Sequence, residues 1–190
     1  GYKYAYNDGD GSTYYDADLP LQVTGMDGAF HDAELAIQPL PLAGMKDDYF
    51  LLNGRGYPDT INTNVLYNVN GAPVQNVHAK LVATAGRKIL LRISNLATVD
   101  FTTLSSTLPM RVVGRGARLL RGPAPAGGGT GKNLSHMTTS VTMGGGESYD
   151  AIVDTTGVAP GTYFIYSSNL NQLSNGTEDH GGIMTEIEIQ

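Results

Sequence analysis

Short apolar segments bounded by turn-forming residues recur along the chain from about residue 48 onward. Residues 49–52 form one such segment, and residues 88–95 form another that is long enough to be a central strand. Further segments follow at residues 99–103, 110–114, 138–143, 149–153, 162–167 and 183–189. Short strands spaced by roughly 8–12 residues predict an all-β sandwich or barrel.

Glycine and proline limit how much helix the chain can form. Its 190 residues include 25 Gly and 9 Pro, which favours tight turns over long helices. Pro39, Pro41 and Gly44 leave room for at most one or two helical turns in the segment 32–46. Alternating apolar residues at 19–23 predict a half-buried strand.

We predict one folded domain. Residues 1–18 are rich in Tyr and Asp and predict an extended arm or linker. The Gly- and Pro-rich residues 122–129 break the strand pattern, but strands of similar length resume after them, so we interpret them as a surface loop. A single β-sandwich domain is therefore expected over residues 19–190.

The composition of the chain excludes several function classes. The net charge is −6 and no basic cluster occurs, whereas binding to nucleic acid or to an anionic membrane surface needs such a cluster. No apolar run approaches the ~18 residues of a membrane-spanning helix. Without cysteine, the chain has no disulfide, thiolate metal site or Cys nucleophile. It begins at Gly1 without an apolar signal segment, which indicates a processed chain or a piece of a longer one.

The four histidines, His31, His78, His136 and His180, lie far apart in the sequence. None of them has a second His at ligand spacing such as His-x-His. We interpret them as surface residues or as hydrogen-bonded structural residues. A mononuclear site built from distant histidines stays open, because the fold could bring them together.

Residues 8–12 (Asp-Gly-Asp-Gly-Ser) offer carboxylates at alternate positions, as calcium loops do. However, Thr13 stands where such a loop needs its sharp-turn Gly, and Leu19 stands where it needs a bidentate Glu. We therefore predict an ordinary turn stabilised by Asp side chains.

Residues 127–132 (Gly-Gly-Gly-Thr-Gly-Lys) resemble a phosphate-binding loop in composition, but Ala126 and Asn133 replace its first Gly and its Ser or Thr. A flexible loop is the prediction. No Ser lies in a Gly-x-Ser-x-Gly motif. Residues 178–180 (Glu-Asp-His) and 47–48 (Asp-Asp) are the remaining groups of ionisable side chains, and we interpret both as solvated turns.

Five segments of the chain, in this order, resemble segments of one protein family. They are residues 52–60 (with Asn-Gly-Arg-Gly-Tyr-Pro-Asp-Thr), 92–96 (Arg-Ile-Ser-Asn-Leu), 110–114 (Met-Arg-Val-Val-Gly), 145–154 (with Gly-Glu-Ser-Tyr-Asp) and 160–166 (with Pro-Gly-Thr-Tyr). Together they are similar to the second cupredoxin-like domain of a laccase-like multicopper oxidase, over about residues 18–190. One departure is Gly116, which stands where the family has Asp.

The resemblance implies a cupredoxin-like Greek-key β-sandwich, and it also defines what the chain lacks. The family binds copper through His-x-His pairs and a His-Cys-His strand, and neither pattern occurs here. Residues 166–169 (Tyr-Ser-Ser-Asn) stand where copper-bearing domains place their ligands. Met184 could pass for an axial copper ligand, but the chain offers it no Cys partner.

By resemblance, we expect the middle domain of such an oxidase, which binds no copper and holds the copper-bearing domains in register. No catalytic, cofactor-binding or metal-binding residue is then expected in this chain. Copper and the oxidoreductase activity would belong to the parent enzyme, and copper-bearing cupredoxin domains would be the partners. An extracellular or periplasmic location is also implied.

Two other function classes stay open. A structural β-sandwich could assemble into a filament or surface layer, with residues 2–15 of one subunit pairing with a sheet edge of an identical subunit. A carbohydrate-binding or other ligand-binding sandwich would be expected to expose Trp, and the chain has no Trp. We therefore rank ligand binding last.

Overall fold

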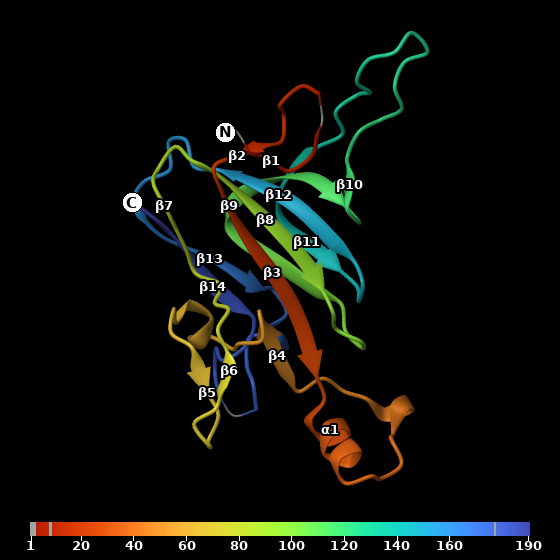
Figure 1. Cartoon of the computed structure of the whole chain (residues 1–190), viewed down its shortest axis with the longest axis vertical. Coiled ribbons are helices and arrows are strands. Elements are labelled where there is room, and N and C mark those ends of the chain that lie inside the picture. Colours follow the sequence, from red (N-terminus) through yellow and green to blue (C-terminus); the bar gives the residue numbers. More distant parts are fainter. Residues whose placement is uncertain (1–2, 8, 177) are drawn as a thin grey trace.

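The computed structural model of the protein describes residues 3–7, 9–176 and 178–190 (Figure 1). Strands dominate it, which confirms the predicted all-β class. The strands are β1 (Lys3–Tyr4), β2 (Tyr14–Tyr15), β3 (Ala17–Met26), β4 (Tyr49–Leu52), β5 (Leu66–Tyr67), β6 (Pro73–Gln75), β7 (Leu81–Ala83), β8 (Lys88–Asn95), β9 (Thr102–Arg115), β10 (Arg118–Leu119), β11 (His136–Met143), β12 (Ser148–Asp154), β13 (Gly161–Ser167) and β14 (Met184–Ile189). The helices are α1 (Gly28–Leu35) and the 3₁₀ turns η1 (Leu42–Gly44), η2 (Asp59–Ile61) and η3 (Leu170–Gln172).

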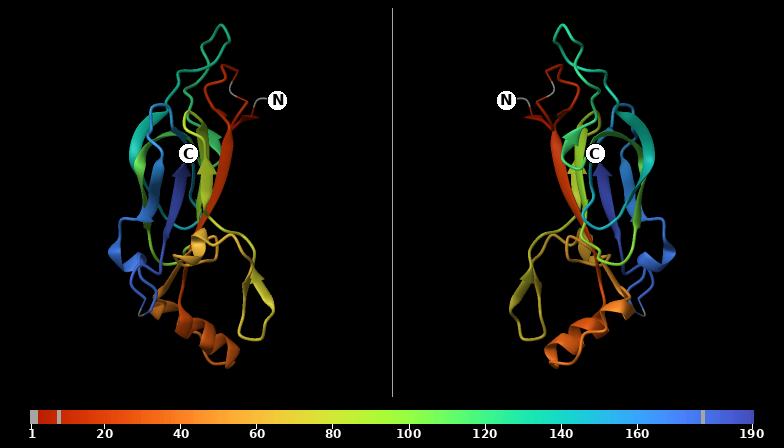
Figure 2. Two further views of the ribbon diagram at one scale, coloured as in Figure 1. Left: turned by 90° about the vertical axis from the view of Figure 1, so that its left-hand side faces the viewer. Right: turned by 90° about the vertical axis from the view of Figure 1, so that its right-hand side faces the viewer.

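Ten of these strands form one curled sheet. Its hydrogen-bonded order is β4-β3-β8-β12-β9-β13-β14-β7, and β10 and β11 also pair with β9. Most pairs are antiparallel, but β3 runs parallel to β8 and β14 runs parallel to β7. Because the sheet folds over on itself, its two halves face each other as the layers of a sandwich (Figure 2).

Strand β9 belongs to both layers. Its C-terminal part, 111–115, pairs with β12, while its N-terminal part, 104–106, pairs with β13. Between these parts the register with β11 shifts, since Thr138 lies opposite Met110 but Ser140 lies opposite Ser105. The extra residues on β9 include Pro109, which has no N–H to donate. The predicted separate strands at 99–103 and 110–114 are therefore wrong, because one strand bends through this bulge without ending.

The main core lies between the two layers and is filled by inward-facing residues such as Leu91. A smaller core covers the outer face of the central strands, where Leu90, Val113 and Ile152 are also buried. Tyr6 and Tyr15 of the N-terminal segment pack against these three residues. Because β8 is covered on both faces over residues 89–91, Ile-Leu-Leu stand in a row there, where a one-sided strand would alternate with polar residues.

The N-terminal hairpin, β1 with β2, is held against the sheet by polar contacts. The Tyr6 hydroxyl donates a hydrogen bond to the Asp150 carboxylate, and Arg111 donates one to the Ser12 carbonyl at 2.7 Å. Burial of the phenol, followed by this contact with Asp150, raises the pKa of Tyr6. Gly114 makes the approach possible, because a Cβ there would lie 2.3 Å from the Tyr6 hydroxyl oxygen. Strand β3 continues from this hairpin at Ala17.

Helix α1 is short because of its boundaries. Asp27 caps its start, with Oδ1 accepting a hydrogen bond from the Phe30 N–H at 3.0 Å. The chain leaves the helix through Ile37, whose φ is 55°, before Pro39. The predicted limit of one or two turns fits the eight residues of α1, although the helix begins before residue 32. In the part of the chain that the structure describes, no helix has the length and apolar character needed to cross a membrane.

Candidate functional site

The four histidines lie on separate elements. His31 is in α1, His78 follows β6, His136 begins β11, and His180 lies in the loop before β14. His31 Nδ1 lies 3.8 Å from the Glu34 carboxylate on the helix surface. Within residues 3–7, 9–176 and 178–190, no three His, Cys, Asp or Glu side chains gather as a metal-binding group.

Residues 9–12 form a turn around Asp10. Its Oδ1 accepts a hydrogen bond from the Ser12 N–H at 2.9 Å, and its Oδ2 accepts one from the Arg121 guanidinium at 2.8 Å. The Ser12 amide and hydroxyl, then Arg121, hold the pKa of Asp10 below its ordinary value. Asp8, the first residue of the predicted turn, lies outside the described residues. Asp10 thus fastens the N-terminal hairpin to the base of the connection between β10 and β11.

The predicted loop at 127–132 lies within a longer connection from β10 to β11. The Gly122 N–H donates to the Lys132 carbonyl at 2.8 Å and closes this connection at its base. It projects from the sandwich at the end opposite α1 (Figure 1). The chain continues into strand β11, so the strand–loop–helix arrangement of a phosphate-binding site is not formed here.

Residues 178–180 lie in a turn whose base is Asn175. Backbone hydrogen bonds join Asn175 and Glu178 in both directions, at 3.2 and 2.9 Å. The Asn175 side chain accepts a hydrogen bond from the Phe50 N–H at 2.6 Å and donates one to the Gly181 carbonyl at 2.8 Å. This amide holds the turn against β4.

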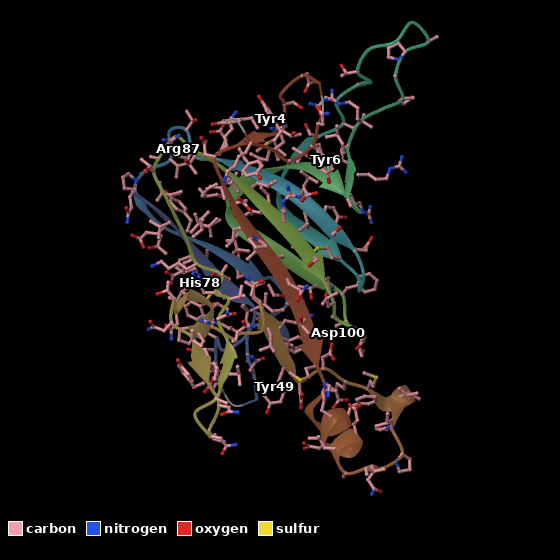
Figure 3. The ribbon with its side chains drawn as sticks, in the orientation of Figure 1. Tyr4, Tyr6, Tyr49, His78, Arg87 and Asp100 are labelled. Carbon is pink, nitrogen blue, oxygen red and sulfur yellow. The ribbon has the colours of Figure 1, made fainter. Side chains whose placement is uncertain are left out.

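One end of the sandwich carries segments that extend beyond the sheets, and we call it the α1 end. It comprises residues 26–48, with α1 and η1, residues 53–78, with β5 and β6, and the described residues 168–176 and 178–182. Figure 2 shows the α1 segment and the β5–β6 hairpin leaving the same end of the molecule. In Figure 3, Tyr49 and Asp100 lie toward this end, and Tyr4 and Tyr6 lie toward the opposite end.

The β5–β6 hairpin is attached to the sandwich by a buried arginine. Arg55 has only 1% of its surface exposed, and its guanidinium donates hydrogen bonds to four backbone carbonyls. The acceptors are Asp59 and Gln75 at 3.0 Å, Asn64 at 2.9 Å, and Asn62. Because these carbonyls come from both arms of the segment, one side chain fixes its shape.

Both projecting segments expose apolar side chains. Helix α1 has no buried residue, and Val69, in the turn between β5 and β6, is fully exposed. The exposed apolar residues of the two segments are Leu35, Ile37, Leu40, Leu42, Val65, Tyr67, Val69, Val74 and Val77. Such a concentration at one end of a domain is typical of a surface that meets another protein surface.

A cleft of about 610 Å³ also opens at the α1 end. Its lining includes the carboxylates of Asp47, Asp48 and Asp100 and the amides of Asn169 and Asn171. We call it the acidic cleft. Asp48 precedes β4 and Asp100 precedes β9, while Asn169 caps η3 and Asn171 lies within it, so three separate segments converge here.

Asp47 is the unusual member of the acidic cleft. Its side chain is buried, with 4% of the residue exposed, and neither carboxylate oxygen has a hydrogen-bond partner among the described residues. Burial raises the pKa of Asp47, and repulsion from Asp100, Asp27 and Asp48 adds to the rise. The prediction of a solvated turn at 47–48 is therefore wrong for Asp47, because the connection from η1 to β4 folds it inward.

The sequence matches the multicopper oxidase family over residues 29–187. A search of curated proteins found no match.

Solved structures of copper oxidases share the fold. The blue copper oxidase from Nitrosomonas europaea is 17% identical, with a TM-score of 0.63 over 90% of this chain and 43% of that one. The multicopper oxidase mgLAC is 17% identical, with a TM-score of 0.60 over 91% of this chain and 44% of its own. The laccase from Botrytis aclada is 16% identical, with a TM-score of 0.59 over 93% and 30%.

These likenesses agree with the predicted cupredoxin-like Greek-key β-sandwich, which is thereby confirmed. The chain spans less than half the length of each of these structures. The family match covers most of the chain, including the segments through which the resemblance was predicted. The chain belongs to the multicopper oxidase family.

Proposed function

We propose that this chain is a cupredoxin domain that binds no copper itself and holds the copper-bearing domains of a multicopper oxidase in register. The oxidoreductase activity would then belong to the assembled enzyme. The proposal includes an extracellular or periplasmic location, which the family resemblance implies.

The main support for the proposal is the set of side chains found at the position of the copper ligands. By the family resemblance, residues 166–169 correspond to the position where copper-bearing domains place ligands. There the buried Ser167 hydroxyl donates to Gln172 Oε1 at 2.8 Å. Gln172 in turn donates to the Phe101 carbonyl at 3.0 Å. Hydroxyl and amide groups that satisfy one another in this way leave no thiolate or imidazole for copper.

The remaining donors fit copper no better. Met184 is half-buried at the start of β14, but a blue copper site needs a Cys thiolate, which the chain does not contain. The histidines lie on four different elements. The side chains present therefore do not fit either a blue copper centre or a cluster of copper ions.

The exposed surface supports a scaffold role. The α1 segment and the β5–β6 hairpin present apolar side chains beyond the sandwich, and Arg55 holds the hairpin in a fixed shape. A rigid apolar projection is suited to bury its side chains against a neighbouring domain.

The test is a copper and assembly measurement. The purified chain is analysed for copper, and it is then mixed with copper-loaded cupredoxin domains of a multicopper oxidase in sedimentation experiments. We expect no stoichiometric copper and no blue absorption band in the chain alone, and a defined complex after mixing. Val69→Asp should weaken the complex, whereas the control Met137→Asp, exposed on β11, should not.

Two outcomes would overturn the scaffold function. Stoichiometric copper with an intense blue band in the isolated chain would contradict the donor argument. Concentration-dependent polymers that disappear when residues 1–15 are removed would favour the alternative of a self-assembling structural subunit.

A further inference from the structure

The carboxylate of Asp47 is packed against the backbone of β3. A Cβ at Gly25 would lie 2.0 Å from Asp47 Oδ2 and 2.5 Å from its Cγ, so the carboxylate occupies the space of a missing side chain. The position is nearly closed to bulk solvent. A buried carboxylate without a hydrogen-bond donor is costly, since the charged form loses its hydration and gains nothing in return.

The neighbouring acids differ from Asp47 in their donors. Asp27 accepts hydrogen bonds from the Phe30 N–H at 3.0 Å and the Lys46 N–H at 2.9 Å, and these bonds lower its pKa. Asp48 accepts one from the Gly28 N–H at 2.9 Å. Those two acids accept backbone hydrogen bonds at the start of α1. Asp47 lines the acidic cleft and has no hydrogen-bond donor among the described residues.

No cation of the described chain neutralises the cleft. The ion pairs within the described residues involve other acids, and none includes Asp47, Asp48 or Asp100. Lys46 lines the cleft but is exposed to solvent. The cleft therefore carries an excess of negative charge around a carboxylate that lacks N–H donors.

The kind of cation follows from the geometry. The acids of the cleft do not converge as a group of three or more metal ligands in the part of the chain described, so no cage of carboxylate ligands is formed. A guanidinium or ammonium group needs no cage, because its N–H donors bind one carboxylate directly while the charge is shared with others nearby. The cleft is also open to a side chain that enters from outside.

The acidic cleft lies at the α1 end, among the segments that expose apolar side chains. We infer that the cleft receives a lysine or arginine side chain from the adjoining cupredoxin domain, with Asp100 as its direct acceptor and the buried Asp47 carboxylate as a nearby counter-charge. This inference rests on the proposed scaffold function and names the charged contact of that interface. The apolar projections would supply buried area, and the cleft would fix the orientation of the partner.

The first test uses a small cation on the intact chain. N-acetyl-arginine amide is titrated into the protein and followed by NMR at the Gly25 amide and the Asp47 carboxyl carbon, with the uncharged N-acetyl-citrulline amide as the matched probe. We expect saturable shifts with the arginine probe alone. In Asp47→Asn the dissociation constant of the arginine probe should rise at least tenfold, because the variant lacks one buried charge that attracts the probe.

Asp32→Asn is the control variant, since Asp32 is an exposed acid on α1 outside the cleft lining. It should bind the probe as the unmodified chain does. Asp100→Asn, which changes a half-buried acid of the cleft lining, should also weaken binding, and it provides the test if Asp47→Asn proves poorly folded. Equal responses to the arginine and citrulline probes, or unchanged binding in both cleft variants, would overturn the inference. Tighter, saturable binding of calcium chloride at the same resonances would assign the cleft to a metal ion and would also overturn it.

The second test separates the inference from the scaffold function. Asp47→Asn is mixed with the copper-loaded domains in the sedimentation experiment described above. A weakened complex supports the inference. An unchanged complex refutes the charged contact while leaving the scaffold function standing, and no complex with the unmodified chain refutes the scaffold function itself.

Discussion

Replacing Arg55 with Met tests whether one buried guanidinium holds the β5–β6 hairpin. Met keeps much of the side-chain volume but donates no hydrogen bond. The change removes the donors of four backbone carbonyls, at Asp59, Asn62, Asn64 and Gln75. Arg55 and its four acceptors lie outside the strands of the ten-stranded sheet, so the effect should be concentrated in residues 59–77.

The size of the destabilisation depends on how many of these four carbonyls can accept a hydrogen bond from water in the variant. Asp59 and Asn64 are exposed residues, and their carbonyls can regain hydration at small cost. Asn62 and Gln75 are half-buried, and each unsatisfied acceptor there costs roughly 1–3 kcal/mol. We therefore expect Arg55→Met to lower the free energy of unfolding by about 3 kcal/mol.

Urea denaturation followed by circular dichroism measures that free energy, and amide hydrogen exchange shows where protection is lost. Arg118→Met is the control, because Arg118 is exposed on β10 and should change stability by no more than about 0.5 kcal/mol. If the two variants have the same stability and the same exchange pattern over residues 59–77, the reasoning about Arg55 is refuted.

Three further predictions concern other parts of the molecule. Gly114→Ala should displace the N-terminal hairpin, because the added Cβ would lie 2.3 Å from the Tyr6 hydroxyl; limited proteolysis should cut residues 7–12 faster than in Gly127→Ala, whose Cβ meets no atom within 4 Å. For Asp47→Asn, the gain in unfolding free energy over the unmodified chain should grow as the pH rises above the ordinary pKa of an Asp side chain, about 4. The raised pKa of Asp47 means that its stabilising protonated form is lost as pH rises through the folded value; a pH-independent difference would contradict this. Leu91→Ala should cost about 2–5 kcal/mol in urea denaturation, because Leu91 is fully buried in the main core; a loss below 1 kcal/mol, roughly the surface-mutation level, would argue against the core assignment.

The central strands could be predicted because their pattern is local. Residues 88–95 coincide with β8, and the predicted segments 138–143, 149–153 and 162–167 lie within two residues of β11, β12 and β13. In these segments, β-branched and aromatic residues run between Gly- or Pro-containing turns. Such signals depend on neighbouring residues alone, so no tertiary information is needed to interpret them.

Other elements could not be predicted because distant contacts create them. The strand β9 looked interrupted, since Ser106 and Pro109 resemble a loop. Pairing with β13 up to Ser106 and with β11 again from Met110 nevertheless keeps this stretch within one strand. Strands β5 and β6 lie in a segment of mixed Asn and apolar residues whose shape depends on Arg55. The partners of Arg55 are backbone carbonyls, which carry no residue-specific signal in the sequence.

The acidic cleft also could not be predicted from neighbouring residues in the sequence. Adjacent acids before an apolar strand ordinarily indicate a solvated turn, and Asp48 is indeed exposed. Asp47 is buried because Gly25, more than twenty residues earlier, leaves space beside the backbone of β3. A glycine within a strand signals that something approaches closely, but the sequence does not say which residue it is.

The bend of β9 has a mechanical consequence. One continuous strand, β9, is hydrogen-bonded into both halves of the fold. Sliding one half over the other would therefore break the backbone hydrogen bonds of β9 with β11, β12 and β13 together. A load applied at either end of the molecule is thus carried by the same backbone. Under a shearing force the domain should therefore unfold cooperatively in one step, without an intermediate in which one half has separated from the other.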